Sequence, residues 1–330
     1  MQTRIAIIGS GSWATALAKL FLNNCASINW FIRNQADINY FKEFKNNPKY
    51  LRSVDFDVKK INFYTSIKDC FLNSDIIVLA VPSAFLDDTF KNLTPSNFEN
   101  KQFFSAIKGI IPQHNLIVGE YLNRIYKVPF DNIGVITGPC HAEEVAMEKL
   151  SYLTIASQNN ANAQTVSTLL NCRYIKSTIS DDIYGTEYSA VLKNVIAVAG
   201  GICHGLGYGD NFLAVLVSNA IQEIKRFVDA VHPIDRDIKA SAYLGDLLVT
   251  AYSQFSRNRM FGTMLGKGYG VKQAQLEMNM IAEGYYAVKC VHEINKNYNV
   301  TMPITNAVYN IVYLNKDVKK EIEHLSNLLS

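Results

Sequence analysis

Arg4-Ile-Ala-Ile-Ile8, followed at once by Gly9-Ser-Gly11-Ser-Trp-Ala14, determines how the N-terminal half of the chain is interpreted. A short apolar run of strand type enters the pattern G-x-G-x-x-A, and a helical pattern continues over residues 13–22. Gly9 permits a tight turn, Gly11 lets a pyrophosphate approach the backbone, and Ala14 keeps helix and strand close. The N-terminus of the helix then faces the anion. This order predicts a dinucleotide-binding domain of the Rossmann type.

Four later segments have the composition of strands in a parallel sheet. Residues 28–32 are predicted to form the second strand. Residues 75–81 are an apolar run, as expected of a parallel strand covered on both faces, and residues 103–107 and 133–137 repeat this form. Ligands of open α/β sheets bind beyond the carboxyl ends of the strands. We therefore predict that one crevice is lined by residues placed just after strands, namely Ser12, Trp13, Arg33, Pro82, Lys108 and Gly138.

Arg33 bears on the choice of cofactor. Sites specific for NAD usually place an acidic residue after the second strand, where it binds the ribose 2′-hydroxyl. This chain has Arg33 there, and a guanidinium pairs well with a 2′-phosphate. The residue favours NADPH, with NADH as the alternative cofactor. Two alternatives stay open: Arg33 stacks on the adenine, or its side chain lies in solvent.

Residues 185–201 predict a helix that is apolar on most sides and yet carries Lys193. Its stripe of bulky side chains should face a core. The opposite face carries small residues, so another part of the protein or a ligand can approach the helix backbone closely there. The stripe consists of Tyr188, Val191, Leu192, Val195 and Ala199. A buried lysine must be paired or neutral. The alternative is a lysine that extends its ammonium from the helix edge into water.

Helical periodicity continues through the C-terminal half. Residues 212–231 predict a helix behind Asp210-Asn211 as N-cap, and residues 238–252 predict another. Asp246 is the only acid of the second helix, and Lys193 is its natural partner because an isolated carboxylate needs a cation or a donor. A capped or water-facing Asp246 is the alternative. Residues 286–330 indicate helix and nothing more specific.

Residues 254–259 predict a binding site for an anion. Ser256-Arg-Asn-Arg259 precedes four glycines at positions 262, 266, 268 and 270, which indicate a glycine-rich loop. Arginine binds phosphate oxygens bidentately, so Arg257 and Asn258 are candidates for a phosphate clamp. A solvated surface loop would have the same composition.

Composition restricts the class of protein. The chain has 330 residues, 48% of them hydrophobic and 18% charged, and a net charge of +3. These values predict a globular protein of two domains, which we place at 1–182 and 183–330, with no nucleic-acid partner. The apolar runs are too short to span a membrane. Six scattered cysteines without zinc-ligand spacing predict reduced thiols, a cytoplasmic location and no metal site.

Taken in order, these segments resemble NAD(P)-dependent glycerol-3-phosphate dehydrogenase of the bacterial type. The resemblance covers residues 9 to 284. The matching blocks are Gly9-Ser-Gly-Ser-Trp13, Val81-Pro-Ser83, Lys108-Gly-Ile110, Gly138-Pro139 with Ala142, Leu192-Lys-Asn194, Gly245-Asp-Leu247, Ser256-Arg-Asn-Arg259 and Ala282-Glu-Gly284. The chain departs from the family at Cys140, where a serine or threonine is common. It departs also after Asn211, where many bacterial members carry an arginine.

The resemblance implies a Rossmann-type doubly wound sheet followed by an all-helical domain like that of 6-phosphogluconate dehydrogenase. It implies interconversion of glycerol 3-phosphate and dihydroxyacetone phosphate by hydride transfer, with the product used for phospholipid synthesis. Lys193 would be the acid/base, Lys108 would stabilise the developing alkoxide, and Asp246 would position Lys193. The implied substrate-binding residues are Lys108, Gly138, Cys140, Asn194, Asp246, Ser256, Arg257 and Asn258. The implied cofactor-binding residues are Gly9, Gly11, Ser12, Trp13, Arg33, Lys108, Ala142, Arg257, Ile281 and Glu283.

Two other functions fit the sequence less well. A related β-hydroxyacid-type dehydrogenase would share the architecture but needs one cation for a carboxylate rather than the Arg257-Asn258 pair. A non-catalytic NADPH-binding sensor would have no use for Lys108, Lys193 and Asp246 together. The expected partner is a small phosphorylated substrate, and a homodimer is a further hypothesis.

Overall fold

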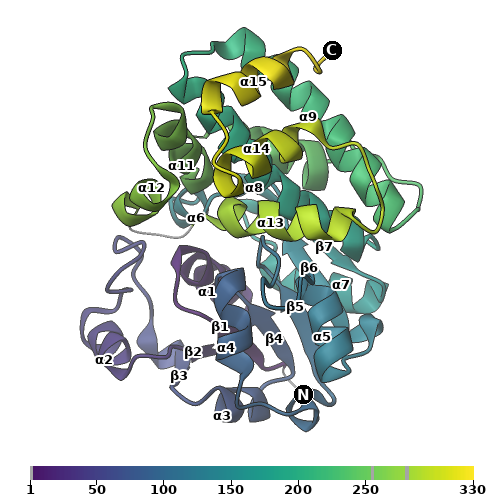
Figure 1. Cartoon of the computed structure of the whole chain (residues 1–330). Helices are drawn as coiled ribbons and strands as arrows, with labels where there is room; N and C mark the ends of the chain where they lie inside the picture. Colours follow the sequence, from purple (N-terminus) through teal and green to yellow (C-terminus); the bar gives the residue numbers. More distant parts are fainter. Residues whose placement is uncertain (1–2, 254–255, 279–281) are drawn as a thin grey trace. The chain divides into compact units, whose positions relative to one another are not determined.

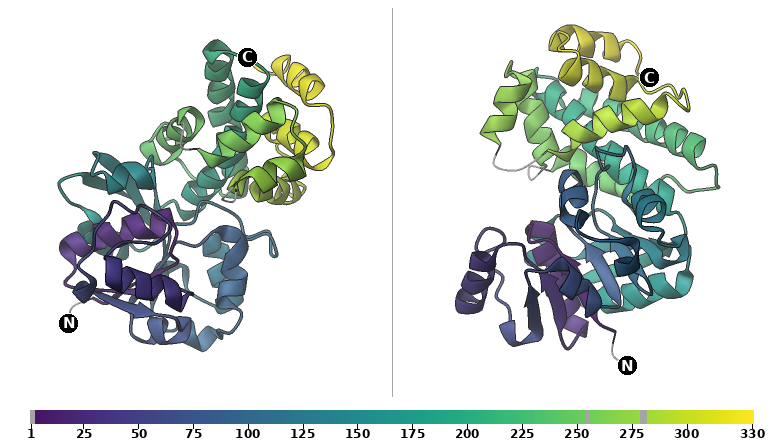
Figure 2. Two further views of the ribbon diagram at one scale, coloured as in Figure 1. Left: turned by 90° about the vertical axis from the view of Figure 1, so that its left-hand side faces the viewer. Right: turned by 60° about the horizontal axis from the view of Figure 1, so that its bottom comes forward.

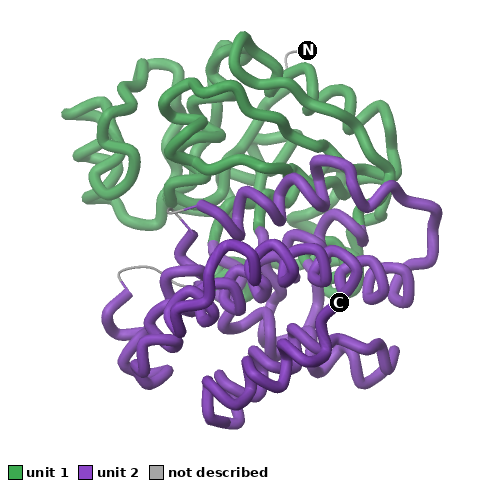
Figure 3. The backbone as a smooth tube through the Cα atoms, turned by 90° about the horizontal axis from the view of Figure 1, so that it is seen from above, with its two compact units in different colours: residues 1–81, 85–107, 118–183 green, residues 82–84, 108–117, 184–330 purple. Residues whose placement is uncertain are grey.

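The computed structural model describes residues 3–253, 256–278 and 282–330. The chain divides into two compact units, coloured separately in Figure 3. Unit 1 comprises residues 1–81, 85–107 and 118–183, and unit 2 comprises residues 82–84, 108–117 and 184–330. Two short segments that follow strands of unit 1 therefore pack with the C-terminal half. The simple division at residue 182 stays a prediction.

Unit 1 is built on an eight-stranded sheet in the order β3-β2-β1-β4-β5-β6-β7-β8 (Figure 1). Strands β1 to β6 are parallel, β7 runs antiparallel to β6, and β8 is parallel to β7. The strands are β1 Ile5–Ile8, β2 Ile28–Phe31, β3 Ile61–Tyr64, β4 Ile76–Leu79, β5 Gln102–Ser105, β6 Ile133–Thr137, β7 Ser151–Ser157 and β8 Ile175–Ser180. The predicted Rossmann-type sheet is thus confirmed.

Helices cover both faces of this sheet, as the doubly wound arrangement requires (Figures 1 and 2). One group is α1 Ser12–Asn24 with α6 Ala142–Ala146 and α7 Asn160–Leu170, each of which contacts α1. The helices α3 Ile67–Leu72, α4 Leu86–Phe90 and α5 Val118–Tyr126 share a separate aromatic cluster with β5. Helix α2 is Gln35–Phe44. The central strands β1, β4 and β6 are buried along their whole length, which is why they carry apolar side chains on both faces of the sheet.

Unit 2 is helical, as the sequence predicts. Its helices are α8 Ile183–Gly205 (whose first residue is grouped with unit 1), α9 Asp210–Val231, α10 Asp246–Tyr252, α11 Arg257–Gly266, α12 Val271–Glu277, α13 Glu283–Asn295, α14 Pro303–Tyr313 and α15 Val318–Ser326. The predicted stripe of α8 from Tyr188 to Ala199 lies in the buried core of the unit. In the described part of the chain, no helix is both long and apolar enough to cross a membrane.

Two predicted helix starts are wrong. Helix α9 begins at Asp210 itself, with Gly209 as N-cap and no capping side chain, so Asp210-Asn211 is the first turn. The segment 238–252 is helical only from Ser241, where a single π-helical turn over Ser241–Gly245 leads into α10. Because the backbone is helical at Gly245 as well, Asp246 lies where the π-helical turn passes into α10.

The predicted glycine-rich loop is also wrong in part, because residues 257–266 form α11. Gly262 and Gly266 face α8 so closely that a Cβ on either would collide with carbonyl groups, those of Val198 and Ile202. Glycine normally weakens a helix, but here it allows two helix backbones to pack against each other. Arg257 and Asn258 consequently stand in the first turn of a helix.

Candidate active site

A buried carboxylate shared by two lysines is the main chemical feature of unit 2. Lys193, on α8, is 5% exposed, and Asp246, at the start of α10, is 2% exposed. The Lys193 ammonium forms an ion pair with Asp246 Oδ1. Lys108 Nζ lies 3.2 Å from each Asp246 oxygen. The pairing that the sequence predicts between Lys193 and Asp246 is therefore present, with Lys108 as a third member.

The surroundings of Lys193 favour its neutral form. Burial lowers the pKa of Lys193 from 10.5 to about 7, and the nearby Lys108 charge lowers the pKa further, whereas Asp246 raises it. Desolvation is the largest of these causes, because a charged ammonium loses more hydration than a neutral amine. A lysine in this state can both give and take a proton near neutral pH, which is what acid/base chemistry needs.

Lys108 is held through its backbone. Asn194 Nδ2, on α8 one residue after Lys193, donates to the Lys108 carbonyl oxygen at 2.7 Å. The next residue, Gly109, has no room for a side chain, since a Cβ would lie 2.5 Å from Ser83 Oγ and 2.6 Å from Glu283 Oε2. These contacts fix the backbone from which Lys108 reaches Asp246.

Glu283, the first residue of α13, binds Ser83 beside this backbone. Its carboxylate accepts hydrogen bonds from the Ser83 backbone N–H at 3.0 Å and from Ser83 Oγ at 2.5 Å. Burial raises the pKa of Glu283, and the Ser83 hydrogen bonds oppose that rise. The sequence assigned no role to Ser83. Ser83 appears in the sequence only as the last residue of the block Val81-Pro-Ser83. Nothing in that block indicates that its hydrogen-bond partner lies 200 residues further along the chain.

The N-terminus of α11 gathers positive charge. Ser256 is the N-cap, and its Oγ accepts from the Arg259 N–H at 3.2 Å. Arg257 is exposed in the first turn, which contains no acidic residue. Asn258 is buried, and its Oδ1 accepts from the Gly284 N–H at 2.9 Å. A guanidinium beside a helix N-terminus is a favourable place for an anion, because both are positive.

In unit 1, the glycine loop has the features needed to bind a dinucleotide. Gly9 has a φ of +121°, and a Cβ there would lie 2.5 Å from the Ala80 carbonyl oxygen, so only glycine fits. Beside Gly11 no atom lies within 4 Å of the Cβ position. Helix α1 starts at Ser12 without a capping side chain or an acid in its first turn. The buried Trp13 Nε1 has no acceptor among the described residues. These residues fit a nicotinamide dinucleotide.

The remaining predicted site residues of unit 1 follow strands or begin helices. Gly138, after β6, has a φ of +126°, and a Cβ there would lie 2.6 Å from the Tyr152 carbonyl oxygen. The Cys140 thiol donates to that same carbonyl at 3.1 Å. Ala142 is the buried first residue of α6, and Arg33 is exposed just beyond β2. Ile281 lies outside the described residues.

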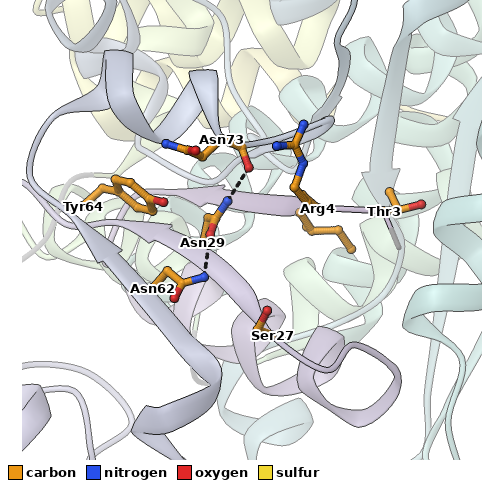
Figure 4. A pocket seen from close by; sticks show the side chains of 8 residues that line it. Thr3, Arg4, Ser27, Asn29, Asn62, Tyr64 and Asn73 are labelled. Carbon is orange, nitrogen blue, oxygen red and sulfur yellow. Dashed lines mark hydrogen bonds between the residues drawn. The ribbon is translucent and has the colours of Figure 1, made fainter. Parts of the chain in front are cut away.

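A polar hollow of about 230 Å³ in unit 1 lies away from these residues (Figure 4). It is lined by Thr3, Arg4, Ile5, Ser27, Asn29, Asn62, Tyr64 and Asn73. Most of them stand at the amino ends of strands, whereas ligands of such sheets bind at the carboxyl ends. The Asn29 amide donates to the Asn73 carbonyl at 2.8 Å and its oxygen accepts from Asn62 at 3.0 Å. We assign the hollow no part in the candidate site.

The described residues contain no cluster of side chains suited to bind a metal ion. Within residues 3–253, 256–278 and 282–330, no three side chains of His, Cys, Asp or Glu are grouped so as to hold an ion. All six cysteines belong to this described part, and none forms a disulfide.

Comparison with known proteins places both units in one family. The family model described as NAD-dependent glycerol-3-phosphate dehydrogenase N-terminus matches residues 4–163, and the model of the C-terminus of that enzyme matches residues 182–323. Two relatives named glycerol-3-phosphate dehydrogenase [NAD(P)+] are similar over 325 residues, which is 98% of both chains in each pair. One, from Staphylococcus aureus, is 33% identical, and the other, from Macrococcus caseolyticus, is 31% identical.

A solved structure of glycerol-3-phosphate dehydrogenase from Coxiella burnetii is similar in three dimensions. It superposes with a TM-score of 0.91 at 27% identity and covers 98% of both chains. Family models and relatives together therefore span nearly the whole sequence, and this chain belongs to the NAD-dependent glycerol-3-phosphate dehydrogenase family.

Proposed function

We propose that this chain interconverts sn-glycerol 3-phosphate and dihydroxyacetone phosphate, with NADPH as the preferred cofactor and NADH as the alternative. The observation that carries the proposal is the buried Asp246 carboxylate with Lys193 and Lys108 on it. When bound, the cofactor supplies the hydride to C2 of the ketone, or takes it from C2 of the alcohol. The protein must then bind the phosphate, manage one proton and stabilise one negative charge.

Lys193 moves the proton. As the ketone is reduced, its C2 oxygen gains negative charge, and the Lys193 ammonium donates a proton to that oxygen and becomes a neutral amine. Lys108 stabilises the developing alkoxide by its charge, which counts for more where water is excluded. Asp246 stabilises the Lys193 ammonium and directs it. Oxidation of the alcohol reverses each step, with neutral Lys193 as the base.

The substrate phosphate binds at the start of α11 in this proposal. The Arg257 guanidinium is exposed and positive, and its charge opposes the rise that burial causes in the pKa of Glu283. The N-terminus of α11 adds a second positive charge, so the two together favour a bound phosphate. Asn258 and Ser256 stand in the same turn and assist. Gly138, Cys140 and Asn194 complete the proposed substrate-binding set. The thiol of Cys140 and the amide of Asn194 already donate to backbone carbonyls, so we expect them to act mainly by position.

The cofactor is held chiefly by unit 1. Gly11, Ser12 and Trp13 bind the pyrophosphate through backbone N–H groups, the α1 N-terminus and the indole N–H. Gly9 contributes the tight turn, because its own N–H donates to the Phe31 carbonyl oxygen at 3.3 Å. Arg33 pairs with the 2′-phosphate. The further proposed cofactor-binding residues are Lys108, Ala142, Arg257, Ile281 and Glu283.

The direct test follows the absorbance of the reduced nicotinamide in the presence of dihydroxyacetone phosphate, with NADPH and NADH in parallel. Rapid oxidation supports the proposal and ranks the two cofactors. A protein that binds NADPH and yet leaves this ketone unreduced contradicts the proposal and favours an unphosphorylated hydroxy acid or a sensor.

Reversing the charge at Arg33 should change the cofactor preference. Arg33 is exposed and forms no ion pair with any residue that the structure describes, so its guanidinium is available to a 2′-phosphate. We expect Arg33→Asp to lower the ratio of kcat/KM for NADPH to that for NADH by about tenfold or more, since a charged hydrogen bond becomes a repulsion. Lys68→Asp, the same charge change on α3, is the control. An unchanged ratio would place the 2′-phosphate elsewhere.

The rate should depend on pH in opposite senses in the two directions. Because burial lowers the pKa of Lys193 to about 7, its ammonium is lost as the pH rises through that value. The kcat for ketone reduction, which needs the ammonium, should fall above pH 7, and the kcat for alcohol oxidation should fall below it. Profiles of kcat at saturating substrate measure this. Asp246→Asn should move both breaks to lower pH, since Asp246 raises the Lys193 pKa.

The wider setting is part of the same proposal. We infer a cytoplasmic enzyme with domains 1–182 and 183–330 that supplies glycerol 3-phosphate for phospholipid synthesis and has no nucleic-acid partner. The composition and the reduced cysteines support this location. A homodimer is the assembly to test, by light scattering of the purified protein.

A further inference from the structure

Three consecutive carbonyl groups of the glycine loop each receive a hydrogen bond from a side chain. The donors are Trp30 Nε1 to Gly9 O at 2.7 Å, Asn47 Nδ2 to Ser10 O at 3.0 Å and Thr15 Oγ1 to Gly11 O at 2.9 Å. They come from β2, from the segment after α2 and from α1. Each of these carbonyl groups is thus held by a side chain, and the Gly11 carbonyl is held also by the Thr15 backbone N–H at 3.0 Å.

The donors lie inside the protein. Trp30 and Thr15 are completely buried, and Asn47 is 2% exposed, so each carbonyl points toward the interior. In a planar trans peptide the carbonyl and the following N–H point in opposite directions. The N–H groups of Ser10, Gly11 and Ser12 are therefore turned away from the interior. None of them donates to a described residue, and the space beside Gly11 is open.

Asn47 links two of these hydrogen bonds, those to the Ser10 and Gly11 carbonyl groups. Its Nδ2 also donates to Thr15 Oγ1 at 2.8 Å, and its Oδ1 accepts from the backbone N–H groups of Lys49 and Tyr50 at 2.9 and 3.1 Å. One buried amide therefore links the turn at residues 47–50, the glycine loop and the first turns of α1. Burying a primary amide is costly unless all its partners are present, and here they are.

The orientation matters because a peptide can be turned over. If the Ser10–Gly11 peptide rotated, its carbonyl oxygen would face the bound anion in place of an N–H group. An attraction would become a repulsion at the place where the backbone approaches the pyrophosphate most closely. A side chain that fixes the carbonyl from behind prevents this rotation without contacting the ligand.

We propose that Asn47, Thr15 and Trp30 are positioning residues for the cofactor: they hold three successive peptides of the glycine loop so that the N–H groups of Ser10, Gly11 and Ser12 face the pyrophosphate. The inference rests on the proposed function only in taking a nicotinamide dinucleotide as the ligand. It predicts that affinity depends on these side chains through the pyrophosphate and hardly at all through the adenosine end.

The test compares two ligands by titration calorimetry on the full-length chain. NADPH contains the pyrophosphate, and adenosine 2′-monophosphate lacks it. In Asn47→Ala and in Thr15→Val, we expect the Kd for NADPH to rise about tenfold and the Kd for adenosine 2′-monophosphate to change by less than about twofold. Thr15→Ser keeps the hydroxyl and should retain the wild-type Kd for NADPH.

A stability control separates positioning from general damage. Asn24, at the other end of α1, donates to the Leu169 and Asn171 carbonyls at 3.1 and 2.8 Å. Asn24→Ala should lower the melting temperature and leave both Kd values unchanged. An NADPH Kd within about twofold of wild type in both Asn47→Ala and Thr15→Val would overturn the inference, as would an equal loss of affinity for both ligands. A wild type that binds NADPH but reduces no ketone would contradict the proposed reaction and leave this inference intact, because its readout is binding.

Discussion

Lys193→Ala is expected to lower kcat by a factor of about 10² or more and to leave the Kd for NADPH nearly unchanged. The side chain is buried against Asp246, whose Oδ1 it shares with Lys108. It belongs to unit 2, whereas the glycine loop belongs to unit 1. Its removal eliminates the proton donor, and Lys108 remains paired with Asp246. Steady-state turnover with saturating dihydroxyacetone phosphate and a separate NADPH titration measure the two quantities.

The control is Lys296→Ala. Lys296 is an exposed lysine that pairs with Glu293 at 2.6 Å and with no other residue that the structure describes, so its loss should affect neither quantity. A Lys193→Ala protein that keeps the wild-type kcat would remove Lys193 from the chemistry. A protein that instead loses NADPH affinity would show that Lys193 acts through the cofactor site. The pH profile adds a second criterion, because the break near neutral pH should disappear with Lys193.

Much of unit 1 could be predicted because its central strands are buried on both faces. Strands β1 and β4 appear in the sequence as continuous apolar runs, and β2, β5 and β6 as runs that contain only one or two polar residues. Strands β3 and β8 form the two edges of the sheet, and each has polar, exposed positions. Exposure at an edge removes the apolar run, so these strands could not be recognised in this way. Strand β7 was not recognised because Thr154 stands in its middle and a serine stands at each end, so it contains no long apolar run.

The ion pair could be predicted because Lys193 is the one lysine of the largely apolar α8 and Asp246 is the one charged residue of α10. Lys193 and Asp246 each had to find a counter-charge, and burial left few choices. Asn47, Thr15 and Ser83 could not be found in this way. Two of them bind backbone carbonyls of the glycine loop, and Ser83 binds a carboxylate far along the chain. The positions of such partners depend on loop conformation and tertiary packing, which the identity of a residue does not reveal.

The same reason explains the error at α11. Four glycines in nine residues indicate a loop, since glycine is unfavourable in an isolated helix. In the folded chain Gly262 and Gly266 are required for helical packing, because the α8 backbone leaves no space for a Cβ. This packing converts the predicted clamp into the first turn of a helix, and the helix N-terminus adds its positive charge to that of Arg257.

Arg257→Ala should accordingly lower kcat/KM for dihydroxyacetone phosphate by roughly 10²-fold, mostly through KM, because it removes a charged, bidentate contact to the phosphate. The same variant should leave kcat/KM for dihydroxyacetone, which has no phosphate, within about twofold of wild type. Arg257→Lys should recover only part of the loss, since an ammonium does not reproduce the planar fork of the guanidinium. Arg226→Ala, on α9, is the matched control, because that arginine donates to the Thr301 carbonyl outside the proposed site. Equal losses with both substrates would mean that Arg257 supports the fold or the cofactor, and the phosphate would then have to bind away from the start of α11.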